Sequence, residues 1–165
     1  METVLLYSAI IFGFSIVGFY YETITKKIKK MPINTIVTGP YHPIYGIGVA
    51  YAFLICSIDF NVWLQFLAIA TGLILFEYLG VLFFNKLLKL ELWDYSNKFL
   101  NLQGQICLSV SIVWIAFSAL FSFLLFGLLT QWLVPTVNVY ILVACLCIIF
   151  IHDLIKTSLK KAGKI

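Results

Sequence analysis

The sequence contains no arginine, and all eleven of its basic residues are lysines. Nucleic-acid recognition favours the planar arginine fork, so we expect no nucleic-acid partner despite the formal net charge of +4. The two histidines and four cysteines form neither a C-x-x-C motif nor a histidine pair. The usual zinc motifs are therefore excluded, and we expect no metal and no cofactor.

Charge of either sign is scarce. Only 11% of the residues are charged and 62% are hydrophobic, whereas about 45–50% apolar residues is usual in a soluble domain. A chain of this size cannot bury so much apolar surface inside a water-soluble globule. The composition therefore predicts an integral membrane protein whose main partner is the lipid bilayer.

Five apolar stretches predict an all-α fold with five transmembrane helices in a single domain over residues 1–165. A helix needs about 20 apolar residues to cross a bilayer. The stretches cover residues 4–21, 44–58, 61–84, 106–129 and 137–155. The second stretch is the shortest and begins among prolines and glycines, so we expect its first turns to be irregular backbone.

The positions of the lysines predict the orientation of the chain in the membrane. They fall in three clusters, Lys26 to Lys30, Lys86 to Lys98 and Lys156 to Lys164, and alternation of the five helices places all three on one side. Positive residues are enriched on the cytoplasmic side of membrane proteins. We therefore predict an external amino terminus and a cytoplasmic carboxyl terminus.

Glu77 has the highest free-energy cost of burial in a membrane, because it lies inside the third apolar stretch, nine positions before Lys86. That separation corresponds to about 13 Å along a helix. Acidic residues within a membrane are rare and usually functional. Glu77 is interpreted as a proton carrier, a cation ligand or a partner for a substrate ammonium group. The alternative is a neutral acid that holds the helices together.

Polar and turn-forming residues gather at the predicted inner ends of the helices. Each group has an ordinary explanation, as an interfacial ion pair, a tight turn or a helix cap. Their one-sided distribution instead indicates a pocket that opens to the cytoplasm or the inner leaflet. The candidate pocket residues are Glu22, Gly39, Pro40, Tyr45, Gly46, Glu77, Trp93, Asp94, Tyr95, Ser96, Asn101 and Gly104.

Three blocks of sequence carry a family resemblance. Residues 39–48 read GPYHPIYGIG, Phe76-Glu77-Tyr78 is followed by Gly80, and residues 93–96 (WDYS) are followed by 101–108 (NLQGQICL). These blocks resemble G-P-x-x-P-I-Y-G-x-G, L-E-Y-x-x-G, and W-D-Y-S with N-x-x-G-x-I-C-L of the putative ABC-transporter type IV permeases. His42 and Phe76 depart from the family pattern, so neither is expected to be essential. The resemblance implies a five-helix protein of the bacterial plasma membrane.

Three functions stay open at this point. A permease-like subunit would need a separate ATPase, because the sequence has no P-loop of the G-x-x-x-x-G-K-[ST] kind. Five helices form a narrow bundle, so a homo-oligomer or a second membrane subunit would complete the path. The alternative is a membrane-embedded enzyme or binding protein acting on an inner-leaflet lipid or lipid phosphate, which would use Glu22, Glu77, Asp94 and Asn101. The third is an accessory protein that binds lipid or regulates a partner.

Overall fold

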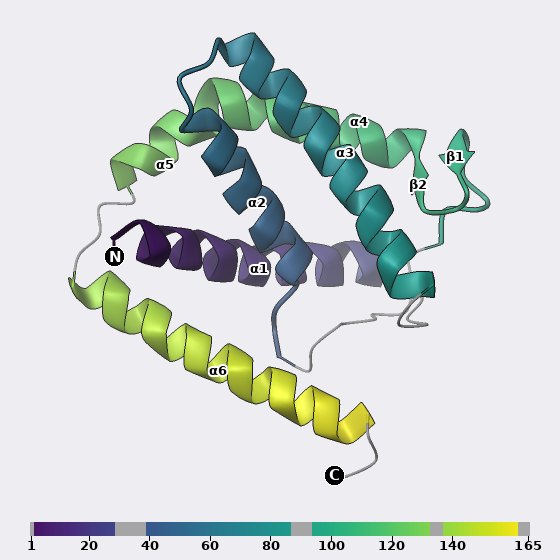
Figure 1. Ribbon diagram of the computed structural model, residues 1–165. Coiled ribbons are helices and arrows are strands. Elements are labelled where there is room, and N and C mark those ends of the chain that lie inside the picture. Colours follow the sequence, from purple (N-terminus) through teal and green to yellow (C-terminus); the bar gives the residue numbers. More distant parts are fainter. Residues whose placement is uncertain (1, 29–38, 87–93, 133–136, 162–165) are drawn as a thin grey trace. The chain divides into compact units, whose positions relative to one another are not determined.

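The computed structural model describes residues 2–28, 39–86, 94–132 and 137–161, and these are mainly helical (Figure 1). The helices are α1 (Glu2–Ile28), α2 (Pro43–Cys56), α3 (Val62–Lys86), α4 (Leu108–Leu120), α5 (Phe126–Trp132) and α6 (Val137–Lys161). A π-helical turn, η1 (Phe121–Leu125), joins α4 to α5 without a break. Each of the five apolar stretches is therefore helical, as predicted.

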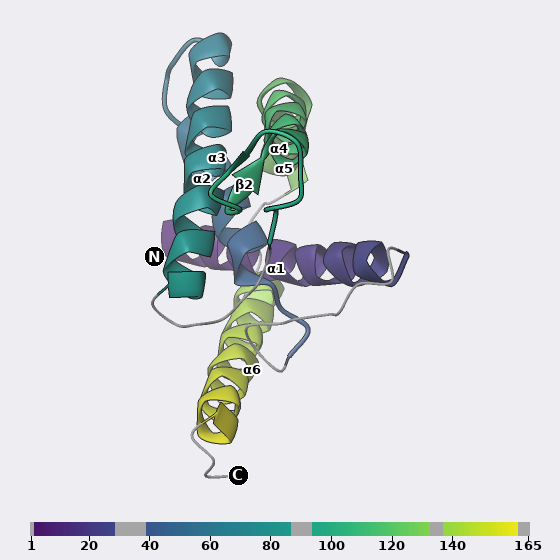
Figure 2. The same ribbon diagram turned by 90° about the vertical axis from the view of Figure 1, so that its right-hand side faces the viewer.

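A short antiparallel hairpin stands beside the helices, formed by β1 (Asn101–Leu102) and β2 (Ile106–Cys107). Asn101 pairs with Cys107 and Leu102 pairs with Ile106. The hairpin leads directly into α4, and it is nearest to the viewer in Figure 2. The sequence predicted a polar connection in this region but no strand pairing.

Within the described residues, three helices are long and apolar enough to cross a membrane, over Val4–Ile28, Val62–Phe83 and Leu108–Gln131, and the helix Pro43–Cys56 is apolar but shorter. Many large apolar side chains on these helices are exposed, including Leu75, Leu79 and Phe83 of α3. Exposed apolar side chains of this kind are expected where lipid covers a helix. The side of the membrane on which each terminus lies stays a prediction.

The helix boundaries differ from the limits of the apolar stretches in two ways. Helix α1 continues to Ile28 and carries Lys26 and Lys27 in its last turn, where cations favour the helix dipole. Helix α2 is regular from Pro43 onward, because proline is well tolerated in the first turn of a helix. The expectation of irregular first turns was therefore wrong, and the described residues directly before α2, 39–42, are non-helical.

The chain is divided into two compact units, one comprising Met1–Ala50 with Leu133–Ile165 and the other Tyr51–Trp132. The division falls within α2. The single domain over residues 1–165 stays a prediction, and the units are described separately below.

In the first unit, α1 packs against the first turns of α2 and against α6. Gly18 of α1 lies against the ring of Tyr45, and Gly46 of α2 lies against the carbonyl of Ile11. Phe12 and Phe150 pack edge to face, with ring centroids 5.3 Å apart, and join α1 to α6. The two glycines therefore allow the close backbone approach on which helix packing in membranes depends.

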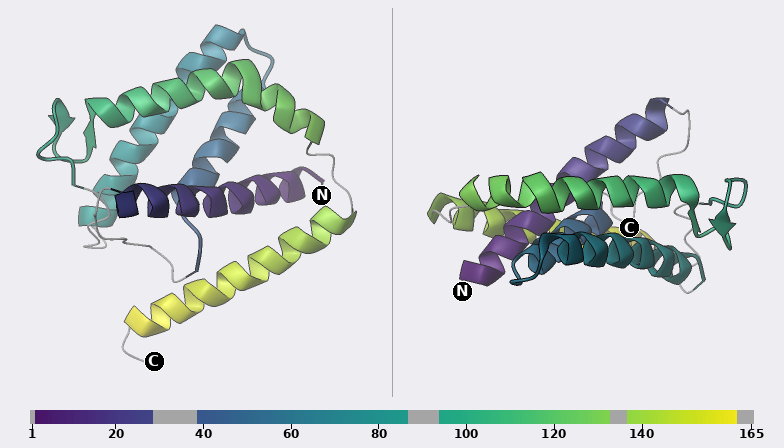
Figure 3. Two further views of the ribbon diagram at one scale, coloured as in Figure 1. Left: turned by 180° about the vertical axis from the view of Figure 1, so that it is seen from behind. Right: turned by 90° about the horizontal axis from the view of Figure 1, so that it is seen from above.

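In the second unit, one stripe of α3 is buried against α4 and the hairpin, and Figure 3 shows α3 and α4 side by side. The buried residues Ile69, Leu73, Glu77 and Val81 are spaced by four, which places them on one helix face. The facing side of α4 and η1 buries Ser118 and Phe121 completely. Glu77 is thus the one acidic member of an otherwise apolar packing stripe in this helix.

The four cysteines differ in burial. Cys56 and Cys107 are buried, whereas Cys145 of α6 is exposed. All four are free thiols.

The tight contact at Gly46 gives a stability prediction. A Cβ at this position would collide with the Ile11 carbonyl oxygen and the Ser15 hydroxyl, so Gly46→Ala should destabilise the protein by about 1–3 kcal/mol. Gly13→Ala is the matched control, because a Cβ there meets nothing within 4 Å, and it should be neutral or stabilise by up to about 1 kcal/mol. Thermal unfolding in detergent measures both, and equal effects would contradict the packing described here.

Candidate functional site

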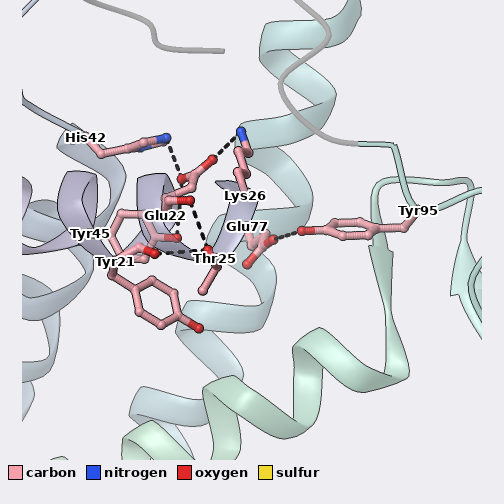
Figure 4. Close-up of polar contacts among 8 residues, drawn as sticks. All are labelled: Tyr21, Glu22, Thr25, Lys26, His42, Tyr45, Glu77 and Tyr95. Carbon is pink, nitrogen blue, oxygen red and sulfur yellow. Dashed lines mark hydrogen bonds and ion pairs between the residues drawn. The ribbon is translucent and has the colours of Figure 1, made fainter. Parts of the chain in front are cut away.

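A buried charged cluster lies in the first unit, where α1 meets the start of α2. One oxygen of Glu22, Oε1, is 2.5 Å from Lys26 Nζ, and the other, Oε2, is 2.7 Å from His42 Nε2 (Figure 4). The Tyr45 hydroxyl donates to the same Oε2 at 3.4 Å. Glu22 is 7% exposed and His42 is 2% exposed. Two basic groups thus compensate a carboxylate that would be costly to bury alone.

Backbone contacts hold His42 in place beside this carboxylate. The His42 amide donates to the Ser15 carbonyl of α1 at 2.9 Å, and the Tyr45 amide donates to the His42 carbonyl at 3.1 Å. These bonds attach the segment 39–42 to one helix and begin the next. Glu22 is therefore positioned by α1, and His42 and Tyr45 are positioned by the turn at residues 39–42 and the first turn of α2.

Helix α6 supports this turn from the other side. The Tyr41 ring packs edge to face on Phe150, with centroids 5.5 Å apart, and Gly39 leaves no room for a Cβ next to the Asp153 carboxylate. Burial, together with the nearby negative charge of Asp153, raises the pKa of Tyr41 above its usual value. The phenol therefore stays neutral and serves as a packing group.

The second polar cluster is centred on Glu77 in the second unit. The Tyr95 hydroxyl donates to Oε1 at 3.1 Å, and the Trp114 indole N–H donates to Oε2. Glu77 is 5% exposed and lies within the span Val62–Phe83. Trp114 belongs to the facing span, and Tyr95 belongs to the connection between the two spans. The carboxyl group is therefore held from two directions at a fixed position inside the helix pair.

The connection that supplies Tyr95 is held by its own polar side chains. Asp94 accepts from the Ser96 hydroxyl at 2.5 Å and from the Ser96 amide at 2.9 Å. The Asn101 side-chain amide donates to the carbonyls of Ser96 and Lys98, both at 3.0 Å, and its oxygen accepts from the Gly104 amide. These bonds use the polar groups of the turn internally, as in other Asx-stabilised turns.

Two further features show how tightly this turn is specified. Hydrogen bonds from the Ser96 hydroxyl and amide lower the pKa of Asp94, which keeps this carboxylate ionised as an acceptor at neutral pH. Leu100, Gln103 and Gly104 have positive φ values of 48°, 55° and 70°. Two non-glycine residues in this region cost free energy that the surrounding hydrogen bonds must offset.

The sequence of the whole chain was compared with those of known proteins. Residues 9–158 match the family model described as putative ABC-transporter type IV. The chain belongs to this family. No curated protein and no solved structure shows significant similarity to it.

The predicted site residues of this type IV family member fall in both units. Glu22, Gly39, Pro40, Tyr45 and Gly46 lie in the first unit, and Glu77, Asp94, Tyr95, Ser96, Asn101 and Gly104 lie in the second. The structure brings Glu22 together with Tyr45, and Glu77 together with Tyr95. It also brings Asp94, Ser96, Asn101 and Gly104 into one turn. Trp93 lies outside the described residues.

Two partners were missed when only the sequence was considered. His42 was set aside as a departure from the family pattern, yet it contacts Glu22 directly. Trp114 was not considered, although it is a tryptophan in the middle of an apolar stretch rather than at its end. An indole N–H buried in an apolar environment needs an acceptor, so its position was the signal that could have revealed a partner for Glu77.

The Glu22 cluster predicts a large loss of stability when its carboxylate is removed. Glu22→Gln should destabilise the protein by about 3 kcal/mol, because the ammonium group of Lys26 would remain buried without a counter-charge. The control is Lys27→Gln, an exposed lysine in the same turn, which should change stability by less than about 0.5 kcal/mol. Thermal unfolding in detergent at neutral pH compares the two, and a similar small effect for both would contradict a buried ion-pair cluster.

The Glu77 cluster predicts coupling between two helices. Trp114→Phe keeps an aromatic ring but removes the N–H donor, and it should destabilise the protein by about 1–3 kcal/mol. The same change in a Glu77→Leu background should cost much less, since no carboxyl remains to be satisfied. A double-mutant cycle by thermal unfolding measures this difference, with the exposed Trp63→Phe as control. If Trp114→Phe costs as much in the Glu77→Leu background as in the native chain, the contact is contradicted.

Proposed function

We propose that the protein is the membrane-embedded subunit of an ABC-type transporter that works with a separate ATPase, and that Glu77 lies on the substrate path. Family membership and the three helices able to cross a membrane support the transport class. The 165-residue sequence has no P-loop, so nucleotide hydrolysis would come from a partner. The bacterial plasma membrane is the proposed location.

The geometry of Glu77 is the observation that carries this proposal. A carboxyl buried within an apolar span is costly, and such residues usually mark ion or substrate pathways. Tyr95 and Trp114 each bind one of its oxygens. In its ionised form this carboxyl group attracts a cation or a substrate ammonium group. A cationic or amine-bearing substrate therefore fits this site best.

The lysine clusters support a cytoplasmic opening and a contact with the ATPase. Among the described residues, Lys26 is paired with Glu22, whereas Lys27 of α1 and Lys156 of α6 are exposed. By the positive-inside rule these lysines lie next to the cytoplasm. Exposed lysines at helix ends are available to contact an acidic surface on a cytoplasmic partner. We propose a homo-oligomer or a second membrane subunit as the way in which this small bundle completes a path.

The alternative of an enzyme acting on a lipid phosphate is less well supported. Asp94 and Asn101 are two of the residues that this alternative would use, but their side chains bond within the turn 94–104. Glu22 is compensated by Lys26 and His42. In the part of the chain that the structure describes, no three His, Cys, Asp or Glu side chains are grouped to hold a metal ion. These contacts favour structural roles for Glu22, Asp94 and Asn101, three of the four residues that this alternative would use.

Glu77→Gln tests the transport proposal. The tagged protein is purified from native membranes in mild detergent, and P-loop proteins that copurify with it are identified by mass spectrometry. ATP hydrolysis by the purified complex is then measured in proteoliposomes. We expect the variant to retain the ATPase partner but to lose at least about tenfold in hydrolysis, because the carboxylate that binds the substrate is gone. Thr71→Val, at an exposed position of the same helix, should leave activity unchanged. Failure to recover any P-loop protein, or full activity of Glu77→Gln, would contradict the proposal.

A further inference from the structure

The turn that connects α3 to the hairpin exposes an apolar tip. Phe99 is 77% exposed, Leu100 is 66% exposed and Leu102 is 55% exposed. Lys98 precedes them and is also exposed. Polar residues of the same turn are meanwhile engaged in internal hydrogen bonds, as Asn101 is with Ser96, Lys98 and Gly104. The turn thus exposes three large apolar side chains, while several of its polar groups bond to one another.

The backbone holds these side chains in fixed positions. Leu100 adopts a left-handed conformation with φ of 48°, which is uncommon for a residue of this type. The Asn101 side chain closes the turn around it, and the β1–β2 pairing follows. A strained conformation that presents an apolar side chain outward indicates a surface that is covered when the protein is in its working environment.

The hairpin is tied to α3 at membrane depth. The Tyr95 hydroxyl reaches Glu77, and Gln103 accepts from the Tyr78 hydroxyl at 3.3 Å. Glu77 and Tyr78 both belong to the span that ends at Phe83. At a rise of 1.5 Å per residue, their backbone lies about 8–9 Å inside that end of the span. The hairpin therefore packs along the end of the span instead of extending away from it.

Chain length then limits how far the tip can extend. Leu100 is three residues from Gln103, so it lies at most about 10 Å from this anchor. The anchored depth and this reach together place the tip near the boundary between hydrocarbon and headgroups, a layer several ångströms thick. Leu108 opens the next span directly after β2, which fixes the other end of the hairpin at the same boundary.

We propose that residues 98–102 form a membrane-interface anchor, in which Phe99, Leu100 and Leu102 enter the lipid and Lys98 contacts anionic headgroups. Aromatic and aliphatic side chains next to a lysine are the combination that binds lipid interfaces. The occupant of this apolar surface is therefore the bilayer and not a soluble partner. This anchor would fix the height of Tyr95, and with it the position of the Glu77 carboxyl.

Fluorescence quenching tests the anchor. Single cysteines at Asn97 and Phe99 are labelled with an environment-sensitive fluorophore, in a background in which Cys56, Cys107, Cys145 and Cys147 are replaced by alanine. The purified protein is placed in vesicles of phosphatidylglycerol and phosphatidylcholine. Lipids brominated near the headgroup should quench the label at position 99 at least about twofold more than the label at position 97. Aqueous iodide should show the opposite order.

A second measurement needs no cysteine replacement and covers the case in which that background fails to fold. A photoreactive phenylalanine analogue at position 99 of the otherwise native chain should crosslink to phospholipid in cell membranes. Equal access of iodide to both labels would overturn the proposal by placing the tip in water. Shielding from both quenchers, or crosslinks to protein alone, would also overturn it and would assign the surface to a protein partner. None of these outcomes depends on transport activity, so the anchor and the proposed function can fail separately.

Discussion

The structure depends on satisfying carboxyl groups that are buried among apolar helices. An isolated charge in such a place costs several kcal/mol or more, so it persists only with partners. The described part of the chain has two such carboxyl groups, Glu22 and Glu77, and their partners differ in kind. Glu22 lies between Lys26 and His42, whereas Glu77 accepts hydrogen bonds from the Tyr95 hydroxyl and the Trp114 indole. The Lys26 ammonium group offsets the charge of Glu22, so this cluster resembles a structural joint. Neither the hydroxyl nor the indole carries a charge, which is why Glu77 and not Glu22 is the better candidate for the substrate path.

Most of the fold could be predicted from composition and apolar length, and the exceptions have physical reasons. The five apolar stretches correspond to helices, but α1 extends to Ile28 and α6 extends to Lys161. The end of an apolar stretch marks the end of contact with lipid, whereas a helix continues as long as its backbone hydrogen bonds are made. The regular start of α2 at Pro43 and the β1–β2 hairpin were not predicted. Both depend on turn geometry, which the pattern of hydrophobic residues does not indicate.

The candidate site was predictable as a set of residues but not as a set of contacts. Glu77 and Tyr95 were both named from the sequence, and they bond to each other. Trp114 completes the same cluster from 37 positions away along the chain, and periodicity alone cannot determine which helix faces meet. His42 was dismissed because it departs from the family pattern, although it lies against Glu22. Departure from a family pattern is therefore weak evidence against a structural role, since a different side chain can occupy the same cluster.

The W-D-Y-S block illustrates how a conspicuous polar motif can be mainly a scaffold. Asp94, Ser96 and Asn101 bond to one another's backbone or side chains and to Gly104. Among the described residues of the block, Tyr95 is the one whose side chain reaches a second element. The polar residues shape the turn, the turn fixes the tyrosine, and the tyrosine positions the carboxyl of Glu77. If the apolar tip at residues 99–102 is held in lipid, the same turn also fixes the depth of that carboxyl relative to the membrane surface. The chemistry of the site would then be concentrated in one residue, with the rest of the motif setting where that residue can act.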